Sequence, residues 1–568
     1  MSKNLIIVES PAKTRTLKKF LGADYQVEAS MGHIRDLVKK DMGIGPDFEP
    51  HYEVLDAKKN VVKKLRQAAG KADVVFLAPD PDREGEAIAW HIAQVLNKDP
   101  EKVERVTFNE ITRRAVLSAL EHPRRIDARK VDAQQTRRLL DRLMGFRLSP
   151  LLWDKIKQGL SAGRVQSVAL KMVCDRQAEI DVFVPEEYWN LSADLQGEEP
   201  PAFTAKLHRI DGEKAVVGDG ERAAAIVEAL RGGSFTVRAI ERKESLQRPG
   251  APFITSRLQQ DAARRYGFSV KRTMAVAQGL YEGKEIGDRG AIGLITYMRT
   301  DSTRVAEEAL EESRKVIAAT YGEKALPAKP VRYRSKKGAQ DAHEAIRPTN
   351  FDLPPEKLEG YLKPEELKLY KLIWDRFIAS QMKPAVFDVT QVDIDNGPYT
   401  LRARGKVLKS PGFLAVYQEA ADEDARAKDD ENGEGAVMPP LREGQVLELL
   451  ELHSEQKFTQ PPARYSEATL VKALEENGIG RPSTYAQILA TLTDRDYVER
   501  IERRFAPTAL GKLVNKMLQG SFHEIINEGY TAALEEELDQ IEDGKKAWKE
   551  ALARFNEQLS KDLASAEA

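Results

Sequence analysis

The chain has 568 residues, 41% apolar and 31% charged, which is enough for about three to five globular domains with ample core. Lys and Arg number 88 against 90 Asp and Glu, and this net charge of −2 excludes a dedicated nucleic-acid packaging protein, so any nucleic-acid surface must be local. The single cysteine, Cys174, excludes an internal disulfide and a zinc site made of several cysteines, and the lack of an apolar run near the ~20 residues of a membrane span predicts an intracellular protein.

The first part of the chain alternates between strand and helix patterns. The apolar run 5–8 leads through a turn into a helix-like segment, and the run 73–78 leads through the acidic loop 79–86 into the helix-like segment 87–96. Strands that alternate with helices predict a parallel sheet covered by helices.

Carboxylates gather behind these strands. Four of them directly follow the second strand: Asp80, Asp82, Glu84 and Glu86. Glu9 follows the first strand in the same way, so it meets the acidic loop if the two strands are neighbours. Carboxylates without His or Cys are hard oxygen ligands that suit Mg²⁺, and without a cation their repulsion leaves one carboxyl protonated and able to act as a general acid. The alternative is a surface turn that caps the following helix.

Residues 127–182 have a helical pattern. Over 127–176 there are 11 Lys and Arg and 5 Asp and Glu, a net charge of +6. Next to the other signals this favours a DNA-facing surface, and the alternative is an ordinary solvated helix face.

A β-rich pattern begins near 184 and returns at 385–408 and 445–452. Between these parts, 253–384 is mostly helical, so a β-rich domain is predicted to be interrupted by a helical insert. The stretch 419–434, with 8 acidic and 2 basic residues, is typical of a disordered surface loop.

The insert contains GLITYMRTDSTR at 293–304, where Tyr297 and Arg299 are two positions apart and point to one face if the segment is extended. A tyrosine is a poor nucleophile because its pKa is about 10, but a nearby guanidinium favours the phenolate and binds phosphate oxygens. Attack on a phosphodiester would preserve the bond energy in a DNA–protein linkage, so resealing would require no ATP. Consistent with this, the chain has no GxxxxGK[ST] loop for a nucleotide. The alternative is an ordinary tyrosine at a domain interface.

Further along, His343 lies in DAHEAIRPT with Arg347, as either a phosphate or base contact or a polar helix start. The segment 464–512 predicts a helix-turn-helix with a wing, which often binds DNA but is also a common packing unit. A helical pattern at 531–566 ends the chain.

Several of these segments together resemble the type IA DNA topoisomerases, and most closely their bacterial topoisomerase I branch. The resemblance runs from residue 3 to about 560 through motifs in the expected order: IVESPAKTRTLKKFLG, APDPDREGEAIAWH, SPLLWDKIKQGLSAGRVQSVAL, PFITSRLQQDAARRYGFS, GLITYMRTDSTR, DAHEAIRPT and ARYSEATLVKALEENGIGRPSTYA. Met298 after the tyrosine favours the topoisomerase I branch, because topoisomerase III relatives usually carry Pro there.

The resemblance implies roles for particular residues. Tyr297 would be the nucleophile that forms a 5′-phosphotyrosine bond, with Arg299 on the scissile phosphate. Glu9 and Lys13 would assist proton transfer and phosphate binding. The implied Mg²⁺ ligands are Glu9, Asp80, Asp82 and Glu84. The implied DNA-binding residues are His33, Arg137, Asp141, Arg164, Gln166, Gln259, His343, Arg481 and Thr484. For Arg481 and Thr484, a plain helix N-cap is the alternative.

The implied architecture is multidomain, α/β plus α+β: a Toprim Rossmann-like parallel sheet, helical domains and a β-rich arch that form a toroid. The expected division is 1–35 and 61–126 for the Toprim domain; 36–60, 127–183 and 456–568 for a helical base with a helix-turn-helix-like (CAP-like) unit; 184–252 and 385–455 for the arch or hinge; and 253–384 for the domain that carries the tyrosine.

The implied activity is ATP-independent relaxation of negatively supercoiled DNA by transient cleavage of one strand, strand passage and religation. The expected partner is single-stranded or negatively supercoiled DNA, without a membrane or ATP, for a monomer in the cytoplasm at the nucleoid. Many relatives continue into zinc-binding or basic C-terminal regions that this sequence lacks, so relaxation is expected to be less efficient than cutting and joining. The rivals are a Toprim nuclease or primase, which would not need Tyr297, and a non-catalytic DNA-binding module.

Overall fold

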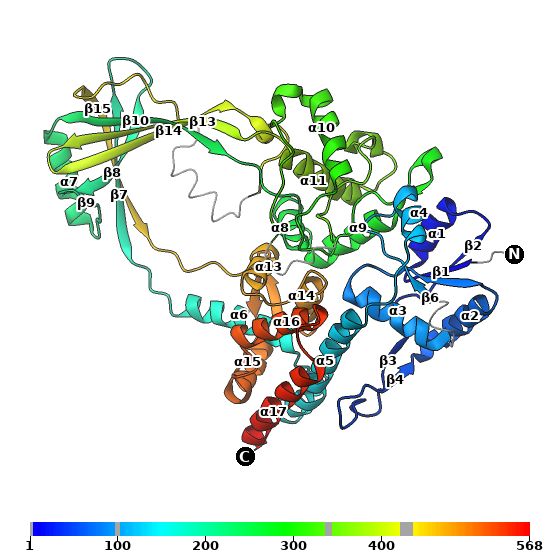
Figure 1. The fold of residues 1–568 in the computed structure, drawn as a ribbon. Helices are drawn as coiled ribbons and strands as arrows, with labels where there is room; N and C mark the ends of the chain where they lie inside the picture. Colours follow the sequence, from blue (N-terminus) through cyan, green and yellow to red (C-terminus); the bar gives the residue numbers. More distant parts are fainter. Residues whose placement is uncertain (1–3, 97–102, 336–342, 421–435, 568) are drawn as a thin grey trace.

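The computed structural model describes residues 4–96, 103–335, 343–420 and 436–567. Figure 1 shows them arranged as a ring, with a helical base at the bottom, a β-barrel at the upper left, a helical insert at the top and a parallel sheet at the right. The multidomain α/β plus α+β toroid expected from the sequence is confirmed. The predicted acidic loop at 419–434 lies outside the described residues, apart from its first two positions.

The N-terminal part forms a four-stranded parallel sheet in the order β2-β1-β5-β6. Its elements are β1 (Asn4–Val8), α1 (Pro11–Phe20), β2 (Tyr25–Ala29), α2 (Lys59–Gly70), β5 (Val74–Leu77), α3 (Arg83–Leu96), β6 (Val103–Arg105) and α4 (Arg113–Glu121), with a small hairpin of β3 (Arg35–Leu37) and β4 (Tyr52–Val54).

The central strand β1 is buried on both faces, because successive side chains of a strand point to opposite sides. Leu5 and Ile7 pack in a core with α2 and α3. Ile6 and Val8 point the other way and share one continuous core with the insert that carries Tyr297. The sheet is therefore the surface against which the insert is held.

The base is helical and holds a winged helix-turn-helix, as predicted. Its elements are α5 (Ala128–Lys155), α6 (Arg164–Asp181), α13 (Glu467–Glu476), α14 (Tyr485–Asp494), β16 (Val498–Ile501), β17 (Arg504–Pro507), α15 (Ala509–Phe522), α16 (Glu528–Glu542) and α17 (Trp548–Glu567). The wing is the β16–β17 hairpin, whose turn places Glu502 and Arg503 at positive φ, as tight hairpin turns require.

The arch is a sheet that closes on itself. Its elements are β7 (Glu187–Gln196), β8 (Phe203–Ile210), β9 (Glu213–Lys214), α7 (Gly220–Gly232), β10 (Phe235–Gln247), β13 (Ala385–Asn396), β14 (Tyr399–Ser410) and β15 (Val446–Phe458). The order β14-β13-β10-β15-β7-β8-β9 is completed by pairing of β14 with β8, which makes a barrel. The sequence did not predict α7, whose Ala223, Ile226 and Leu230 fill the barrel core.

The helical insert interrupts this barrel, as predicted. It contains α8 (Thr255–Tyr266), α9 (Val270–Glu282), β11 (Lys284–Glu285), the 3₁₀ turn η3 (Gly287–Arg289), β12 (Ala291–Ile292), α10 (Glu307–Tyr321) and α11 (Pro364–Ser380). β10 and β13 flank it and pair antiparallel up to Gln247 opposite Ala385, so the chain leaves and re-enters the barrel side by side.

The four-domain division stays a prediction. Two of its boundaries, 60/61 and 455/456, fall inside α2 and β15 and would cut these elements. Within the described residues, no helix is long and apolar enough to cross a membrane.

Close packing of the wing gives a stability test. A Cβ on Gly511, in the first turn of α15, would collide with the backbone carbonyl of Tyr497, so Gly511→Ala should lower the free energy of unfolding by ~1–3 kcal/mol. The control is Gly520→Ala in the same helix, where the Cβ meets nothing within 4 Å and alanine should stabilise by ~0.5–1 kcal/mol. Urea unfolding measures both variants, and equal effects would contradict the packing argument.

Candidate active site

The first part of the site lies at the carboxyl ends of β1 and β5. These strands are parallel neighbours, so Glu9 does meet the acidic loop, as the sequence argument required. Lys13, fully buried in the first turn of α1, makes ion pairs with both Glu9 and Asp80. Ser10 caps α1 and Pro11 starts it, which fixes Lys13 one turn after Glu9.

Glu9 is an unusual carboxyl group. Its Oε1 is in contact with Lys13 Nζ, and among the described residues its buried Oε2 has no hydrogen-bond partner. Burial and the charge of Asp80 raise the pKa of Glu9 to about 8, and Lys13 only partly offsets them. Glu9 therefore holds a proton at neutral pH, as expected for one member of a crowded carboxylate group.

Asp82 connects the acidic loop to the tyrosine. Its Oδ1 accepts a hydrogen bond from the Gly85 backbone at 2.8 Å, which caps α3, and its Oδ2 accepts one from the Tyr297 hydroxyl at 2.7 Å. A Cβ on Gly85 would collide with the backbone of Asp80, so the loop can fold this tightly only with glycine. Asp82 therefore caps the helix, as the alternative held, and its functional role stays a prediction.

Tyr297 and Arg299 lie on one face, as the i, i+2 spacing predicted. Arg299 Nη1 is 3.7 Å from the same Asp82 Oδ2 that receives the Tyr297 hydroxyl. The Arg299 guanidinium does favour the phenolate, as expected, because its charge lowers the pKa of Tyr297, but other effects are larger. Burial and Asp82 raise the pKa of Tyr297 well above its usual value, and the opposing effect of Arg299 is smaller.

The backbone of the insert holds Tyr297 against the sheet. Tyr297 N donates to Asn109 O at 2.7 Å and Gly293 N donates to Ile111 O at 3.0 Å. The Tyr297 ring packs edge-on against Tyr281 and His343, with ring centroids 5.3 and 5.8 Å away.

The segment around His343 is extended, not the start of a helix. His343 is buried, its Nε2 lies 3.5 Å from Pro81 O, and burial lowers its pKa, so it stays neutral beside the tyrosine. Arg347 is engaged by Glu344 and Glu110 at 3.0 and 3.1 Å, which makes it a structural link between insert and sheet.

Glu84 has a separate set of partners. It accepts from Gln134 Nε2 at 3.1 Å, lies 3.3 Å from His33 Nε2 and 3.9 Å from Arg137 Nη1. Burial opposes its ionisation, but the His33 hydrogen bond and the Arg137 charge outweigh it and lower the pKa of Glu84 to about 2.

The acidic side chains fit a hard divalent cation by their donor chemistry and by the buried Glu9 Oε2, which has no partner among the described residues. The carboxylates are not gathered around one point. Lys13 lies between Glu9 and Asp80, and the Tyr297 hydroxyl is hydrogen-bonded to Asp82. Within the described residues, the group of ligand atoms found close together lies elsewhere, on the barrel at Asp194, Glu451 and His453.

Two predicted DNA-binding arginines are held by α16. Arg164 is fully buried, with Nη1 2.6 Å from Glu535 and Nε 3.5 Å from Asp141. Arg481 donates to Asp539 Oδ2 at 2.7 and 3.0 Å and lines a small cavity that Asp82, Arg299 and His343 also line.

Three other residues predicted to contact DNA lie on three different helices. Thr484 is at the N-cap position of α14, but its hydroxyl binds the Arg481 backbone in place of a helix N–H. Gln166 lies in the first turn of α6, half-buried beside Gly163. Gln259 is fully buried in α8, and both ends of its amide lack a partner among the described residues.

The sequence did not identify two residues that support the site, Asp539 and Tyr281. Asp539 binds Arg83 as well as Arg481, and Tyr281 supports the Tyr297 ring and donates to Phe108 O at 3.2 Å. No motif marks them, because their partners lie far away in the sequence.

Comparison with known proteins agrees with this geometry. A family model for DNA topoisomerase matches residues 125–553, and a Toprim domain model matches residues 4–111. The chain is 48% identical over 566 residues to DNA topoisomerase 1 of Rickettsia felis, covering 97% of this chain and 72% of that protein. This chain belongs to the DNA topoisomerase family. It is a type IA isomerase, as its motifs predicted.

Two further topoisomerases are similar. DNA topoisomerase 1 of Xylella fastidiosa is 46% identical over 569 residues, covering 98% of this chain and 69% of that protein. The structure of full-length topoisomerase I from Thermotoga maritima superposes with a TM-score of 0.87 at 40% identity, covering 98% of this chain and 90% of that chain.

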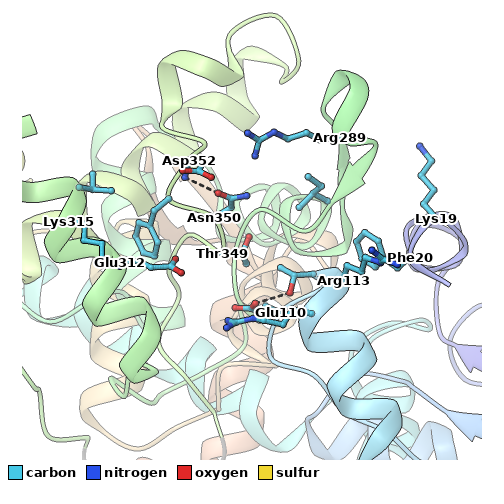
Figure 2. Close-up of a pocket in the computed structure, with 15 residues that line it drawn as sticks. Lys19, Phe20, Glu110, Arg113, Arg289, Glu312, Lys315, Thr349, Asn350 and Asp352 are labelled. Carbon is cyan, nitrogen blue, oxygen red and sulfur yellow. Dashed lines mark hydrogen bonds between the residues drawn. The ribbon is translucent and has the colours of Figure 1, made fainter. Parts of the chain in front are cut away.

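A cavity of about 740 Å³ lies away from this chemistry, on the outside of the junction between sheet and insert (Figure 2). Lys19, Arg113 and Arg289 line it together with Glu312 and Asp352. No residue predicted for the site lines it, so this cavity is separate from the candidate site.

A second cavity, of about 260 Å³, lies beside Glu84 and contains His91. His91 is 3% exposed and packs against Tyr52 and Trp90, with ring centroids 4.6 and 4.9 Å away. Burial, aided by the charge of Arg35, lowers the pKa of His91 to about 3.

This shift predicts an acid-sensitive contribution to stability. The unfolded chain takes up a proton on His91 below about pH 6.5 and the folded chain does not, so the contribution is full above that pH and is lost as the pH falls towards 3. His91→Phe should flatten the plot of unfolding free energy against pH by up to ~1.4 kcal/mol per pH unit. Urea unfolding across this range measures the slope, and the exposed His122→Phe control should leave it unchanged.

Proposed function

We propose that this chain cuts one DNA strand through a 5′-phosphotyrosine bond on Tyr297 and reseals it after strand passage, relaxing negatively supercoiled DNA with Mg²⁺ and without ATP. The observation that carries the proposal is the hydrogen bond from the Tyr297 hydroxyl to Asp82, with Arg299 at the same carboxylate oxygen. A nucleophile, a proton acceptor and a phosphate-binding cation thus lie together at the junction of insert and sheet.

In the cleavage step, the Tyr297 oxygen attacks the phosphorus and its proton passes to Asp82, 2.7 Å away. Arg299 neutralises charge on the phosphate oxygens. The phosphorus–3′-oxygen bond breaks, and the departing 3′-oxygen takes the proton that Glu9 holds because its pKa is about 8. Resealing reverses each transfer, so bonds and protons balance without a nucleotide cofactor.

Lys13 keeps Glu9 and Asp80 together while DNA is absent. Burial opposes its charge, but Asp80, joined by Glu9 when that carboxyl is ionised, outweighs burial and raises the pKa of Lys13 well above its usual value. It therefore stays charged and can bind a phosphate oxygen that enters between the carboxylates.

Toprim domains generally bind a divalent metal, and we assign Mg²⁺ to Asp80, Asp82 and Glu84 with Glu9 beside them. When bound, the cation supplies positive charge that this acidic loop lacks when a phosphate arrives.

For DNA binding we propose two groups of residues. His343 and Arg481 lie at the tyrosine, and His33, Arg137 and Asp141 line the cavity beside Glu84. Four further residues would contact DNA after their side chains leave their present positions: Arg164, Gln166, Gln259 and Thr484. A single strand is the expected substrate, because the tyrosine is buried at a narrow junction.

Strand passage would require the insert to move away from the sheet. The contacts that would break include the backbone hydrogen bonds to Asn109 and Ile111, and the hydrogen bond from Thr16 Oγ1 to Glu282 O at 2.7 Å. The Arg347–Glu110 ion pair and the Tyr297–Asp82 hydrogen bond would break with them. The side-by-side exit of β10 and β13 gives the insert a single attachment about which to turn.

The decisive experiment uses single-stranded oligonucleotides labelled at the 3′ or 5′ end. Wild-type protein should retain the 3′-end label covalently after denaturation, and Tyr297→Phe should lose at least ~10³-fold of this adduct because it lacks the nucleophile. Tyr281→Phe is the matched control, since its ring contacts Tyr297 but its hydroxyl binds Phe108. Free cleavage products from both wild type and Tyr297→Phe would instead support a metal-dependent nuclease.

Metal removal should separate cutting from joining. With EDTA, the oligonucleotide adduct should persist, and relaxation of supercoiled DNA should stop until Mg²⁺ is restored. Gel analysis of adduct and topoisomers measures both. Full relaxation in EDTA would remove Mg²⁺ from the proposal and leave the tyrosine chemistry intact.

A further inference from the structure

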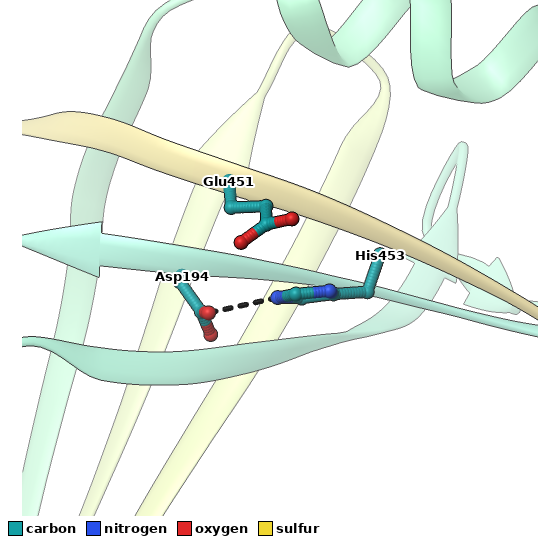
Figure 3. Close-up of side chains that lie close together, drawn as sticks. All are labelled: Asp194, Glu451 and His453. Atoms are coloured by element: carbon teal, nitrogen blue, oxygen red, sulfur yellow. Dashed lines mark hydrogen bonds and ion pairs between the residues drawn. The ribbon is translucent and has the colours of Figure 1, made fainter.

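A second group of metal-ligand side chains lies on the barrel, far along the chain from the acidic loop (Figure 3). Asp194 comes from β7, and Glu451 and His453 come from β15. One ligand atom of each lies within 4.8 Å of the other two, and His453 Nε2 is 2.7 Å from Asp194 Oδ2. Ala193 and Leu195 next to Asp194 fill the barrel core, so Asp194 points to the outer wall.

The register of the two strands produces this convergence. β7 and β15 are antiparallel, with Glu451 directly opposite Asp194, and His453 two residues further on the same face. A register shift between Leu449 and Glu451 sets this pairing. Two carboxylates therefore face each other across neighbouring strands, a like-charge arrangement that destabilises a sheet unless a positive charge compensates it.

One carboxylate is also oriented from outside the group. Thr204, on the next strand β8, donates its hydroxyl to Asp194 Oδ1 at 2.6 Å. The second oxygen, Oδ2, is left to point at His453. Support of this kind behind a ligand is typical of metal sites, where it fixes the direction of the coordinating atom.

We propose that Asp194, Glu451 and His453 bind a divalent transition-metal cation of the zinc class. One imidazole and two carboxylates suit zinc and its neighbours, whereas magnesium prefers oxygen ligands and water alone. Metal–ligand bonds of about 2.1 Å put neighbouring ligand atoms about 3–3.5 Å apart. A torsional adjustment of the exposed Glu451 side chain closes the remaining distance, and water completes the coordination.

The site would link the two legs of the arch. β7 follows α6 and β15 precedes α13, so these strands are the two connections between barrel and base (Figure 1). A cation that bridges them would cross-link β7 and β15 within the barrel wall, away from the base end of this strand pair at Glu187 and Phe458, and without touching Tyr297. This inference does not depend on the proposed DNA chemistry.

The test is zinc binding by the full chain, stripped of metal and held in excess Mg²⁺ to saturate sites made of oxygen alone. Isothermal titration with Zn²⁺ should show one site that His453→Ala weakens at least tenfold, and Thr204→Val should weaken it about tenfold through the lost support. His208→Ala on β8 of the same barrel is the matched control and should bind as wild type does.

Titration with Cu²⁺ followed by electron paramagnetic resonance adds a direct readout, since coupling to an imidazole nitrogen should appear in wild type and vanish in His453→Ala. Thermal melts verify that the variants are folded. Zinc affinity that is unchanged in His453→Ala, or that falls equally in His208→Ala, would overturn the site. Zinc binding lost in Asp82→Asn alone would assign it to the acidic loop and also refute the proposal.

Discussion

Everything at the candidate site depends on the packing of the insert against one face of the parallel sheet. Ile6 and Val8 of β1 share a core with the insert, and the backbone of Tyr297 is bound to Asn109. The same burial that brings the tyrosine to Asp82 also raises its pKa, so the Tyr297 hydroxyl keeps its proton in the closed ring without DNA. Under the proposed mechanism, loss of this proton therefore accompanies the arrival of the substrate phosphate.

In the base, two arginines are likewise engaged by protein groups in the absence of DNA. α16 presents Glu535 and Asp539 to Arg164 and Arg481, two arginines that the family resemblance assigns to DNA. The two arginines outweigh burial and lower the pKa of Glu535 to about 2, so this carboxylate remains charged at any physiological pH. A phosphate must compete with a carboxylate at each arginine, which disfavours weakly held anions and rewards a polyanion that engages several arginines together.

The sequence predicted those parts that follow from local pattern. Alternation of strand and helix gave the parallel sheet, the acidic loop behind β5 gave Asp80 and Asp82, and the i, i+2 spacing gave Tyr297 and Arg299 one face. It did not predict α7, because the sequence around this helix has a strand pattern and the helix is needed only to fill the barrel core. It also did not identify Asp539 and Tyr281, because their partners are distant in the chain. It could not show that burial and the charge of Asp82 outweigh the effect of Arg299 on the pKa of Tyr297, since the extent of burial is not visible in sequence.

The interrupted barrel has a consequence for how the chain folds during synthesis. β10 finds its long partner β13 only after the whole insert has been made, and β7 waits for β15, near residue 458. The parallel sheet, by contrast, has all four strands by residue 105. The barrel is thus dominated by contacts distant in sequence, which form slowly and leave the edges of β7 and β10 unpaired on the nascent chain. The arch should therefore form slowly, and its strands rely on protection until residue 458 has been made.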